Sequence, residues 1–196
     1  MRILGLHTQF HDTGACLLDG ERVVAIEEER LRREKHTDAF PTLAIRHCLD
    51  AFGLAGIEDV DLVAVDHLVD KQPEITAAIR GAGYTGRIVF VDHHDAHAAS
   101  AFFCSPFESA AVLIADGEGS LAHVASEDRP AQPGPIPKSR PRELQSFYRG
   151  VGNQLELVGR TYSTADERNG IGRFYEGISR FLGWGAFGGG RVMGLA

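Results

Sequence analysis

The chain has 196 residues, with 27 acidic against 20 basic side chains and a formal net charge of -7. Hydrophobic residues make up 43% and charged residues 24%, a balance typical of a globular protein and not of a disordered one. An acidic chain without a Lys/Arg run lacks the electrostatic footprint of a nucleic-acid-binding protein. No apolar stretch approaches the roughly 18–20 residues that span a bilayer, and the N-terminus lacks the pattern of a signal peptide. We therefore expect neither a nucleic-acid nor a membrane partner.

The three cysteines, Cys16, Cys48 and Cys104, are widely spaced and form no C-x-x-C pair. This spacing excludes a structural zinc ribbon and a secreted disulfide scaffold. A reducing, cytoplasmic location is the expectation.

The first hundred residues alternate strand and helix patterns. Asp19-Gly20 is typical of a two-residue hairpin turn. Ile45, Leu49 and Phe52 form one apolar helical face that begins after Pro41. The expected order is three strands, then helix, strand, helix, strand and helix, over residues 2–6, 15–18, 22–27, 42–52, 60–65, 74–79, 88–91 and 94–103.

After Pro106 the pattern begins again. An apolar strand over 110–115 is followed by a Pro-rich loop over 128–142, a strand over 144–148 and a helix over 172–182. No element is expected in the Gly-rich segment 183–194. We therefore expect an α/β protein with a first lobe over 1–106 and, over 107–196, the start of a second lobe, in a chain cut part-way.

The sharpest local motif is His93-His94-Asp95-Ala96-His97. His93 and His97 are four residues apart, so on a helix their Cβ atoms lie about 5–6 Å from each other on one face. Two imidazoles at this spacing suit Zn²⁺ or Fe²⁺. An ordinary polar helix start is the alternative, and His94 is expected to face away from the pair.

Asp116-Gly117-Glu118-Gly119 follows a buried strand. The Asp116 carboxylate is well placed to bind a metal, and Gly117 and Gly119 would let backbone amides approach a phosphate. The alternative is a tight hairpin turn with Asp in its usual turn role. With the His pair, Asp116 offers a third metal ligand.

The loop between the first two strands holds His11 and Asp12, either of which could act as an acid or a base. The alternative is a plain hairpin. The mixed-charge run over 27–36 contains Lys35, which could meet an anionic substrate, but its composition favours a solvated connecting segment.

Five motifs occur in one order along the chain and share a common family pattern. They are His11-Asp12-x-x-Ala15, Glu28-Glu29-Arg30 with Lys35-His36, Phe40-Pro41 with Ala44-Ile45-Arg46, His93 to Phe102, and Val192-Met193-Gly194-Leu195-Ala196. Together they resemble the ATP-dependent O-carbamoyltransferases of antibiotic and nodulation-factor biosynthesis. The large N-terminal domain of that family is similar to the ATPase of tRNA threonylcarbamoyladenosine synthesis. The resemblance implies an actin-like ATPase fold with two ribonuclease-H-like lobes.

The resemblance also implies an activity. Carbamoyl phosphate and ATP would yield a carbamoyl-adenylate in a second, smaller domain, and a hydroxyl of a small-molecule acceptor would then be carbamoylated. An iron or zinc ion would be held by His93, His97 and Asp116. His11 would be the base towards the acceptor, and Lys35 would contact the anionic intermediate.

We also expect Asp12, Gly117 and Gly119 to contribute to nucleotide binding. The chain departs from the family pattern at Leu31, where an aromatic residue is usual, and at Arg191, where Lys is usual. A further metal-binding Asp of the family pattern and the second domain are not present in these 196 residues.

The isolated chain is therefore expected to be inactive and to need a C-terminal part or a partner chain. The alternative is a non-catalytic actin-like half that binds a partner supplying the missing lobe. A sugar or acetate kinase of the same superfamily is a weaker alternative.

Overall fold

The computed structural model describes residues 1–196 except 9, 68–70, 118, 121–141 and 164–169. The chain forms two compact units, Met1–His93 and His94–Ala196, and the division falls inside the first turn of one helix. The expected lobe boundary after residue 106 stays a prediction. Most of the expected Pro-rich loop over 128–142 lies outside the described residues.

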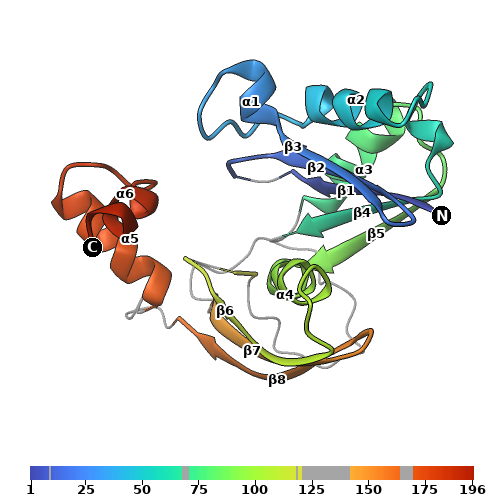
Figure 1. Ribbon diagram of the computed structural model, residues 1–196. Coiled ribbons are helices and arrows are strands. Elements are labelled where there is room, and N and C mark those ends of the chain that lie inside the picture. The colour runs from blue at the N-terminus through green and yellow to red at the C-terminus, as the bar shows by residue number, and fades with distance from the viewer. Residues whose placement is uncertain (9, 68–70, 118, 121–141, 164–169) are drawn as a thin grey trace. The chain divides into compact units, whose positions relative to one another are not determined.

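The first unit is built on a five-stranded sheet in the order β3-β2-β1-β4-β5 (Figure 1). Strands β1, β2 and β3 form an antiparallel meander, whereas β4 and β5 run parallel to β1. This is the strand order of a ribonuclease-H-like lobe, so the expected fold class is confirmed. The strands are β1 (Arg2–His7), β2 (Gly14–Asp19), β3 (Arg22–Glu27), β4 (Leu62–His67) and β5 (Arg87–Asp92).

The helices of the first unit connect its strands. They are α1 (Glu28–Arg32), α2 (Thr42–Ala51), the short 3-10 helix η1 (Ile57–Asp59) and α3 (Gln72–Gly81). Helix α2 packs against β2 and β3, and its apolar face buries Ile45 and Leu49 in the core of this unit, as its periodicity predicts.

Helix α1 corrects the expectation of a solvated connecting segment. Glu28 is fully buried, and its carboxylate accepts hydrogen bonds from the backbone amides of Leu43 and Ala44 at 3.3 and 2.8 Å. These amides have no partner within α2, and a carboxylate at a helix N-terminus is stabilised by the helix dipole. The solvated interpretation is therefore wrong for Glu28, which fixes the start of α2.

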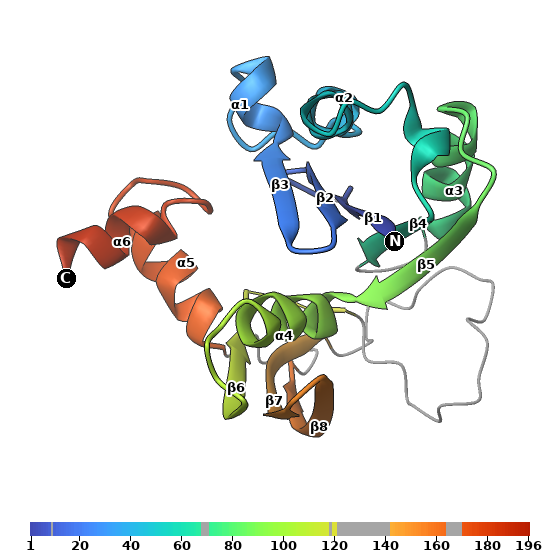
Figure 2. The same ribbon diagram turned by 45° about the vertical axis from the view of Figure 1, so that its right-hand side comes forward.

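The second unit contains an antiparallel three-stranded sheet, β6-β7-β8, with α4 (His93–Phe103) lying along one face (Figure 2). The strands are β6 (Ser109–Ala115), β7 (Glu143–Val151) and β8 (Gln154–Tyr162). Ala98 and Phe102 of α4 pack on Val112 and Tyr148 of the sheet. The meander of three antiparallel strands repeats the pattern of β1 to β3.

The C-terminal part of the second unit contains α5 (Ile171–Phe181) and α6 (Gly189–Leu195), which pack on each other. Strand β8 was not among the expected elements, and α6 lies in the Gly-rich segment where none was expected. Within the described residues, no helix is long and apolar enough to cross a bilayer.

Candidate functional site

The first turn of α4 and the end of β6 bring three expected metal ligands together. One ligand atom each from His93, His97 and Asp116 lies within 4.8 Å of the other two. Nε2 of His97 lies 3.8 Å from a carboxylate oxygen of Asp116. The side chain of His97 is 48% exposed and that of Asp116 33%, so both are open to solvent. Two imidazoles and one carboxylate are a donor set that suits Zn²⁺ or Fe²⁺.

The ring of His93 is oriented by a carboxylate at the end of β4. Its Nδ1 lies 3.0 Å from Asp66, which also lies 2.8 Å from Nδ1 of His7. Burial by itself would raise the pKa of Asp66, but the hydrogen bonds from the two histidines lower it to about 2. An ionised Asp66 favours the proton of His93 on Nδ1, which leaves Nε2 as a metal donor.

A charged network ties α4 to the sheet of the second unit. Asp95 accepts hydrogen bonds from the Tyr148 hydroxyl at 2.6 Å and from the Arg160 guanidinium at 3.0 Å. Arg160 also donates to the buried carboxylate of Glu143 at 2.7 Å. His94 is fully buried with Nδ1 2.7 Å from Ser146, so its side chain anchors the helix inside the unit. These contacts fix the rotation of α4 and therefore the direction of His97.

The backbone amides of the two glycines after β6 donate hydrogen bonds within the second unit. Gly117 donates to the side chain of Asp116 at 2.6 Å, and Gly119 donates to the carbonyl of Glu143 at 2.7 Å. A Cβ on Gly119 would lie 2.4 Å from the ring of His94, so this position requires glycine. Phosphate binding by Gly117 and Gly119 stays a prediction.

A shallow hollow of about 250 Å³ adjoins the candidate metal ligands His97 and Asp116. His97 and Asp116 line it together with side chains from the middle of α4 and from the end of β6. A small molecule fits this volume next to the solvent-exposed side chains of His97 and Asp116.

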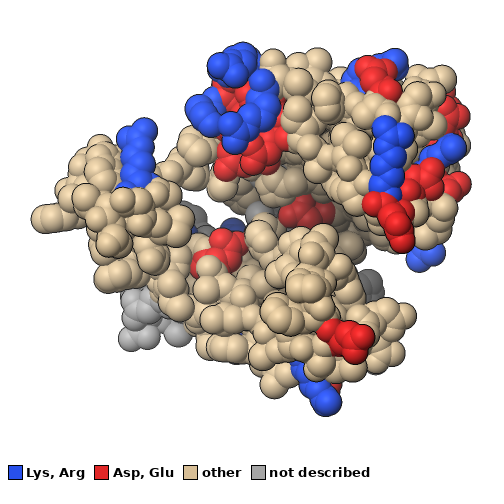
Figure 3. All heavy atoms as spheres, in the orientation of Figure 1, with Lys and Arg blue, Asp and Glu red and all other residues tan. Residues whose placement is uncertain are grey.

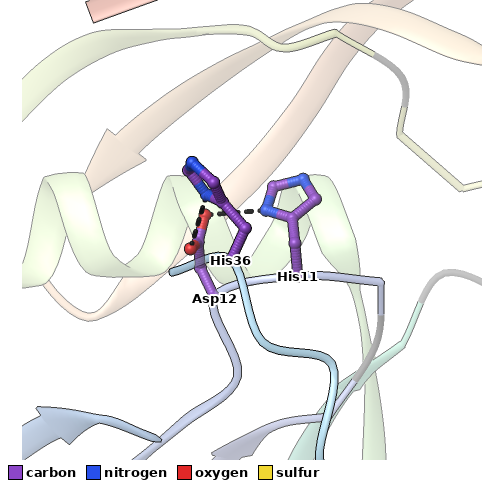
Figure 4. Close-up of side chains that lie close together, drawn as sticks. All are labelled: His11, Asp12 and His36. Carbon is purple, nitrogen blue, oxygen red and sulfur yellow. Dashed lines mark hydrogen bonds and ion pairs between the residues drawn. The ribbon is translucent and has the colours of Figure 1, made fainter. Parts of the chain in front are cut away.

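The first unit contains a second cluster of donors, on the loops after β1 and after α1 (Figure 4). The carboxylate of Asp12 lies between two imidazoles, 2.7 Å from Nδ1 of His11 and 3.1 Å from Nδ1 of His36. The two rings lie edge to face, with their centroids 6.3 Å apart. The expected site residues His11 and Asp12 are thus brought together with a third residue, His36.

Lys and Arg side chains gather over α1 with acidic side chains among them (Figure 3), and Lys35 follows this helix and precedes His36 in the chain. Its Nζ donates to the buried carboxylate of Glu29 at 2.6 Å, and the side chain of Lys35 is 71% exposed. Hydrogen bonds from Lys35 and from the backbone amide of His36 lower the pKa of Glu29 to about 2. Glu29 therefore holds Lys35 next to the loop that carries His36.

Sequence reasoning missed Asp66, His7 and His36 as site residues. Asp66 follows the apolar run of β4, a position comparable to that of Asp116 after β6. This placement at a strand end was the available signal for Asp66. His36 stood in a charged run that was interpreted by its composition alone.

A family model, described as the carbamoyltransferase N-terminus, matches residues 2–85 and 83–173. These matches cover most of the chain. The chain belongs to the carbamoyltransferase N-terminal family. The resemblance seen in the five sequence motifs is therefore confirmed at the level of the family.

Two curated relatives extend over large parts of the chain. The nodulation protein NolNO of Sinorhizobium fredii is 31% identical over 97% of this chain and 28% of its own length. An uncharacterized protein of Synechocystis, sll1178, is 32% identical over 61% of this chain and 26% of its own length. The chain thus spans about a quarter of the length of these relatives. Among solved structures, YeaZ from Pseudomonas aeruginosa has 16% identity and a TM-score of 0.48, over 83% of this chain and 68% of its own.

Proposed function

We propose that this chain is the N-terminal part of a carbamoyltransferase that uses carbamoyl phosphate and ATP, through a carbamoyl-adenylate, to carbamoylate a hydroxyl of a small-molecule natural product. The observation that carries the proposal is the grouping of His93, His97 and Asp116 in a member of the carbamoyltransferase N-terminal family. The second domain, which would form the carbamoyl-adenylate, would come from a longer polypeptide or from a partner chain.

His11 is the proposed base towards the acceptor hydroxyl. Its Nδ1 faces Asp12 at 2.7 Å, and a carboxylate at that position favours the tautomer with the proton on Nδ1. Nε2 then carries the lone pair that takes the hydroxyl proton. The hydroxyl oxygen forms its bond to the carbamoyl carbon as the bond from that carbon to the adenylate oxygen breaks, which releases AMP.

The donor set on α4 and β6 fits the iron or zinc ion that this reaction is expected to use. Two imidazole nitrogens and one carboxylate oxygen suit either metal. A bound ion would offset the negative charge that develops on the leaving adenylate oxygen. Asp66 would keep the ring of His93 in its binding orientation.

Lys35 is proposed to contact the anionic intermediate through its ammonium group. The group is exposed, and Glu29 holds it beside the loop of His36. Asp12, Gly117 and Gly119 are proposed to contribute to nucleotide binding, the glycines by letting backbone amides approach phosphate oxygens.

The experiment measures bound metal in the chain by elemental analysis, for the parent and for three variants. His97→Ala removes a ligand and is expected to abolish stoichiometric iron or zinc at the centre. Asp66→Asn leaves all three ligands in place but is expected to weaken metal binding about 10- to 100-fold. His47→Ala, at an exposed position of α2, serves as the control and is expected to bind like the parent.

Activity is tested with the same variants once the second domain or the partner chain is present. Carbamoyl transfer from carbamoyl phosphate and ATP to a hydroxyl acceptor is expected in the parent and lost in His97→Ala. His11→Asn is expected to lose transfer to the acceptor but to retain formation of carbamoyl-adenylate and pyrophosphate from carbamoyl phosphate and ATP. Full metal content in His97→Ala, or unchanged transfer in His11→Asn, contradicts the proposal.

A further inference from the structure

The cluster of His11, Asp12 and His36 has the composition of a second transition-metal site. It offers two imidazoles and one carboxylate, with one ligand atom from each residue within 4.8 Å of the other two. The side chains are 43%, 35% and 41% exposed in that order, so a hydrated cation can reach them. We propose that this cluster binds a divalent transition ion such as Zn²⁺, independently of the His93, His97 and Asp116 centre.

The distances in the cluster are close to those of a loaded site. Donors bound to one tetrahedral zinc at about 2.1 Å lie roughly 3.4 Å from one another. The carboxylate oxygens of Asp12 lie 2.7 and 3.1 Å from the two Nδ1 atoms. Each Nδ1 faces a different oxygen of this carboxylate (Figure 4), and the three ligand atoms lie within 4.8 Å of one another, so movements of roughly an ångström bring them to one ion. The fourth position would be open to water, as in three-ligand zinc sites.

Two of the three residues of the cluster have an unusual backbone conformation. Asp12 and His36 both have positive φ values, 55° and 56°, a region that few residues other than glycine adopt. Such strain persists where the surrounding structure enforces it, and it is found preferentially at binding and catalytic sites. Here the donors belong to two loops that are separated by 24 residues in the sequence.

The two loops are fixed to each other by hydrogen bonds next to the cluster. Thr13 is fully buried, and its hydroxyl donates to the carbonyl of Ala39 at 2.7 Å. The amide of Thr13 also donates to the carbonyl of Thr37. The second loop is in turn fixed to α1, because the amide of His36 donates to Glu29 at 3.1 Å. The cluster is thus preorganised by its backbone, which lowers the cost of ordering the ligands when an ion binds.

Metal binding at this cluster would change the chemistry of His11. An ion on Nδ1 displaces the proton from that atom, so a neutral ring carries its proton on Nε2. Under the proposed function, Nε2 of His11 must instead hold a lone pair to act as a base. Occupancy of the second site and catalysis by His11 therefore exclude each other, which makes the ion an inhibitor of acceptor carbamoylation.

The test uses Co²⁺, whose visible absorption reports ligation, added to the 196-residue chain. The parent for this experiment is the His97→Ala, Asp116→Ala variant, so that the first centre does not contribute. We expect saturable binding of one Co²⁺ with competition by Zn²⁺. Because this variant lacks the first centre, an absence of Co²⁺ binding would contradict the second site but not the proposed carbamoyl transfer. Conversely, a lack of carbamoyl transfer would not contradict Co²⁺ binding at the second site.

The added variants are Asp12→Asn and His36→Asn, because asparagine tolerates a positive φ and preserves the loops. Each is expected to weaken Co²⁺ binding about 100-fold, whereas His47→Asn in α2 leaves it unchanged. Ring ¹⁵N NMR is expected to show the proton of His11 moving from Nδ1 to Nε2 when Zn²⁺ is added. The proposal is overturned if His36→Asn binds Co²⁺ as tightly as the parent. It is also overturned if the parent shows no saturable Co²⁺ binding, in which case the three side chains form only a hydrogen-bonded group.

Discussion

At the scale of single residues, Glu29 makes stability depend on pH. The hydrogen bond from Lys35 and that from the amide of His36 lower its pKa to about 2, from an ordinary value of 4.5. A depressed pKa stabilises the folded chain above pH 4.5, and this stabilisation is lost as the pH falls from 4.5 towards 2. We expect Glu29→Gln to be less stable than the parent at pH 7 and to lose less stability on acidification. Urea unfolding at pH 7, 4.5 and 2.5 measures both differences.

The matched control for this prediction is Glu21→Gln, because Glu21 is an exposed residue of the turn between β2 and β3. It should reproduce the pH profile of the parent. If Glu29→Gln also follows the parent profile, the ion pair with Lys35 does not contribute to folding.

Predictions of which side chains lie together succeeded where the residues are close in the sequence. His93 and His97 are four residues apart, so helical geometry alone predicted that they share a face. The partners Asp66 and His36 lie 27 and 24 residues away from the side chains they contact. Only the folded sheet and loops bring such residues together, so periodicity and spacing could not identify them.

At the scale of elements, β7 approaches α4 so closely that one position must be glycine. A Cβ on Gly150 would lie 2.6 Å from the ring of Phe102, which is buried in the core of the second unit. The ring cannot move away without disturbing its neighbours, and overpacking of this kind costs about 1–3 kcal/mol. We expect Gly150→Ala to lower the free energy of unfolding by that amount, as measured by urea denaturation.

The neighbouring strand provides the control. Gly159 lies in β8, and a Cβ there meets no atom within 4 Å. Gly159→Ala should therefore change the free energy of unfolding by less than about 0.5 kcal/mol. It could also raise this free energy slightly, because alanine lowers the conformational entropy of the unfolded chain. Equal destabilisation by the two substitutions would show that loss of glycine in the strands, and not the contact with Phe102, is responsible.

Element prediction was accurate for apolar patterns and wrong for charged ones. Strands β1 to β7 and the helix α2 follow from alternation and apolar runs and from an i, i+4, i+7 face, which are local properties, whereas strand β8 was missed. Helix α1 was missed because composition does not reveal that Glu28 caps α2 and that Glu29 pairs with Lys35. Helix α6 was missed because its glycines oppose helix formation when considered alone.

At the scale of the whole molecule, the described residues form two hydrophobic cores, one in each unit. The first core lies between the five-stranded sheet and its helices, and the second lies between α4 and the sheet β6-β7-β8. The order of strands β1 to β7 and of helices α2 to α5 could be predicted from the sequence. The division at residue 93 depends on which core each side chain joins, and only packing determines that.

Two cores imply that each unit can lose its packing on its own. Phe102→Ala removes a buried ring from the second core, at a cost of about 3 kcal/mol, and Leu17→Ala similarly depletes the first. We expect Phe102→Ala to accelerate amide hydrogen exchange in β6, β7 and β8 while β1 to β5 keep their protection, and Leu17→Ala to do the reverse. Hydrogen exchange followed by mass spectrometry of peptides resolves the two sheets. Equal acceleration in both sheets by either variant would mean that the chain unfolds as one cooperative unit, and the two cores would then be energetically a single structure.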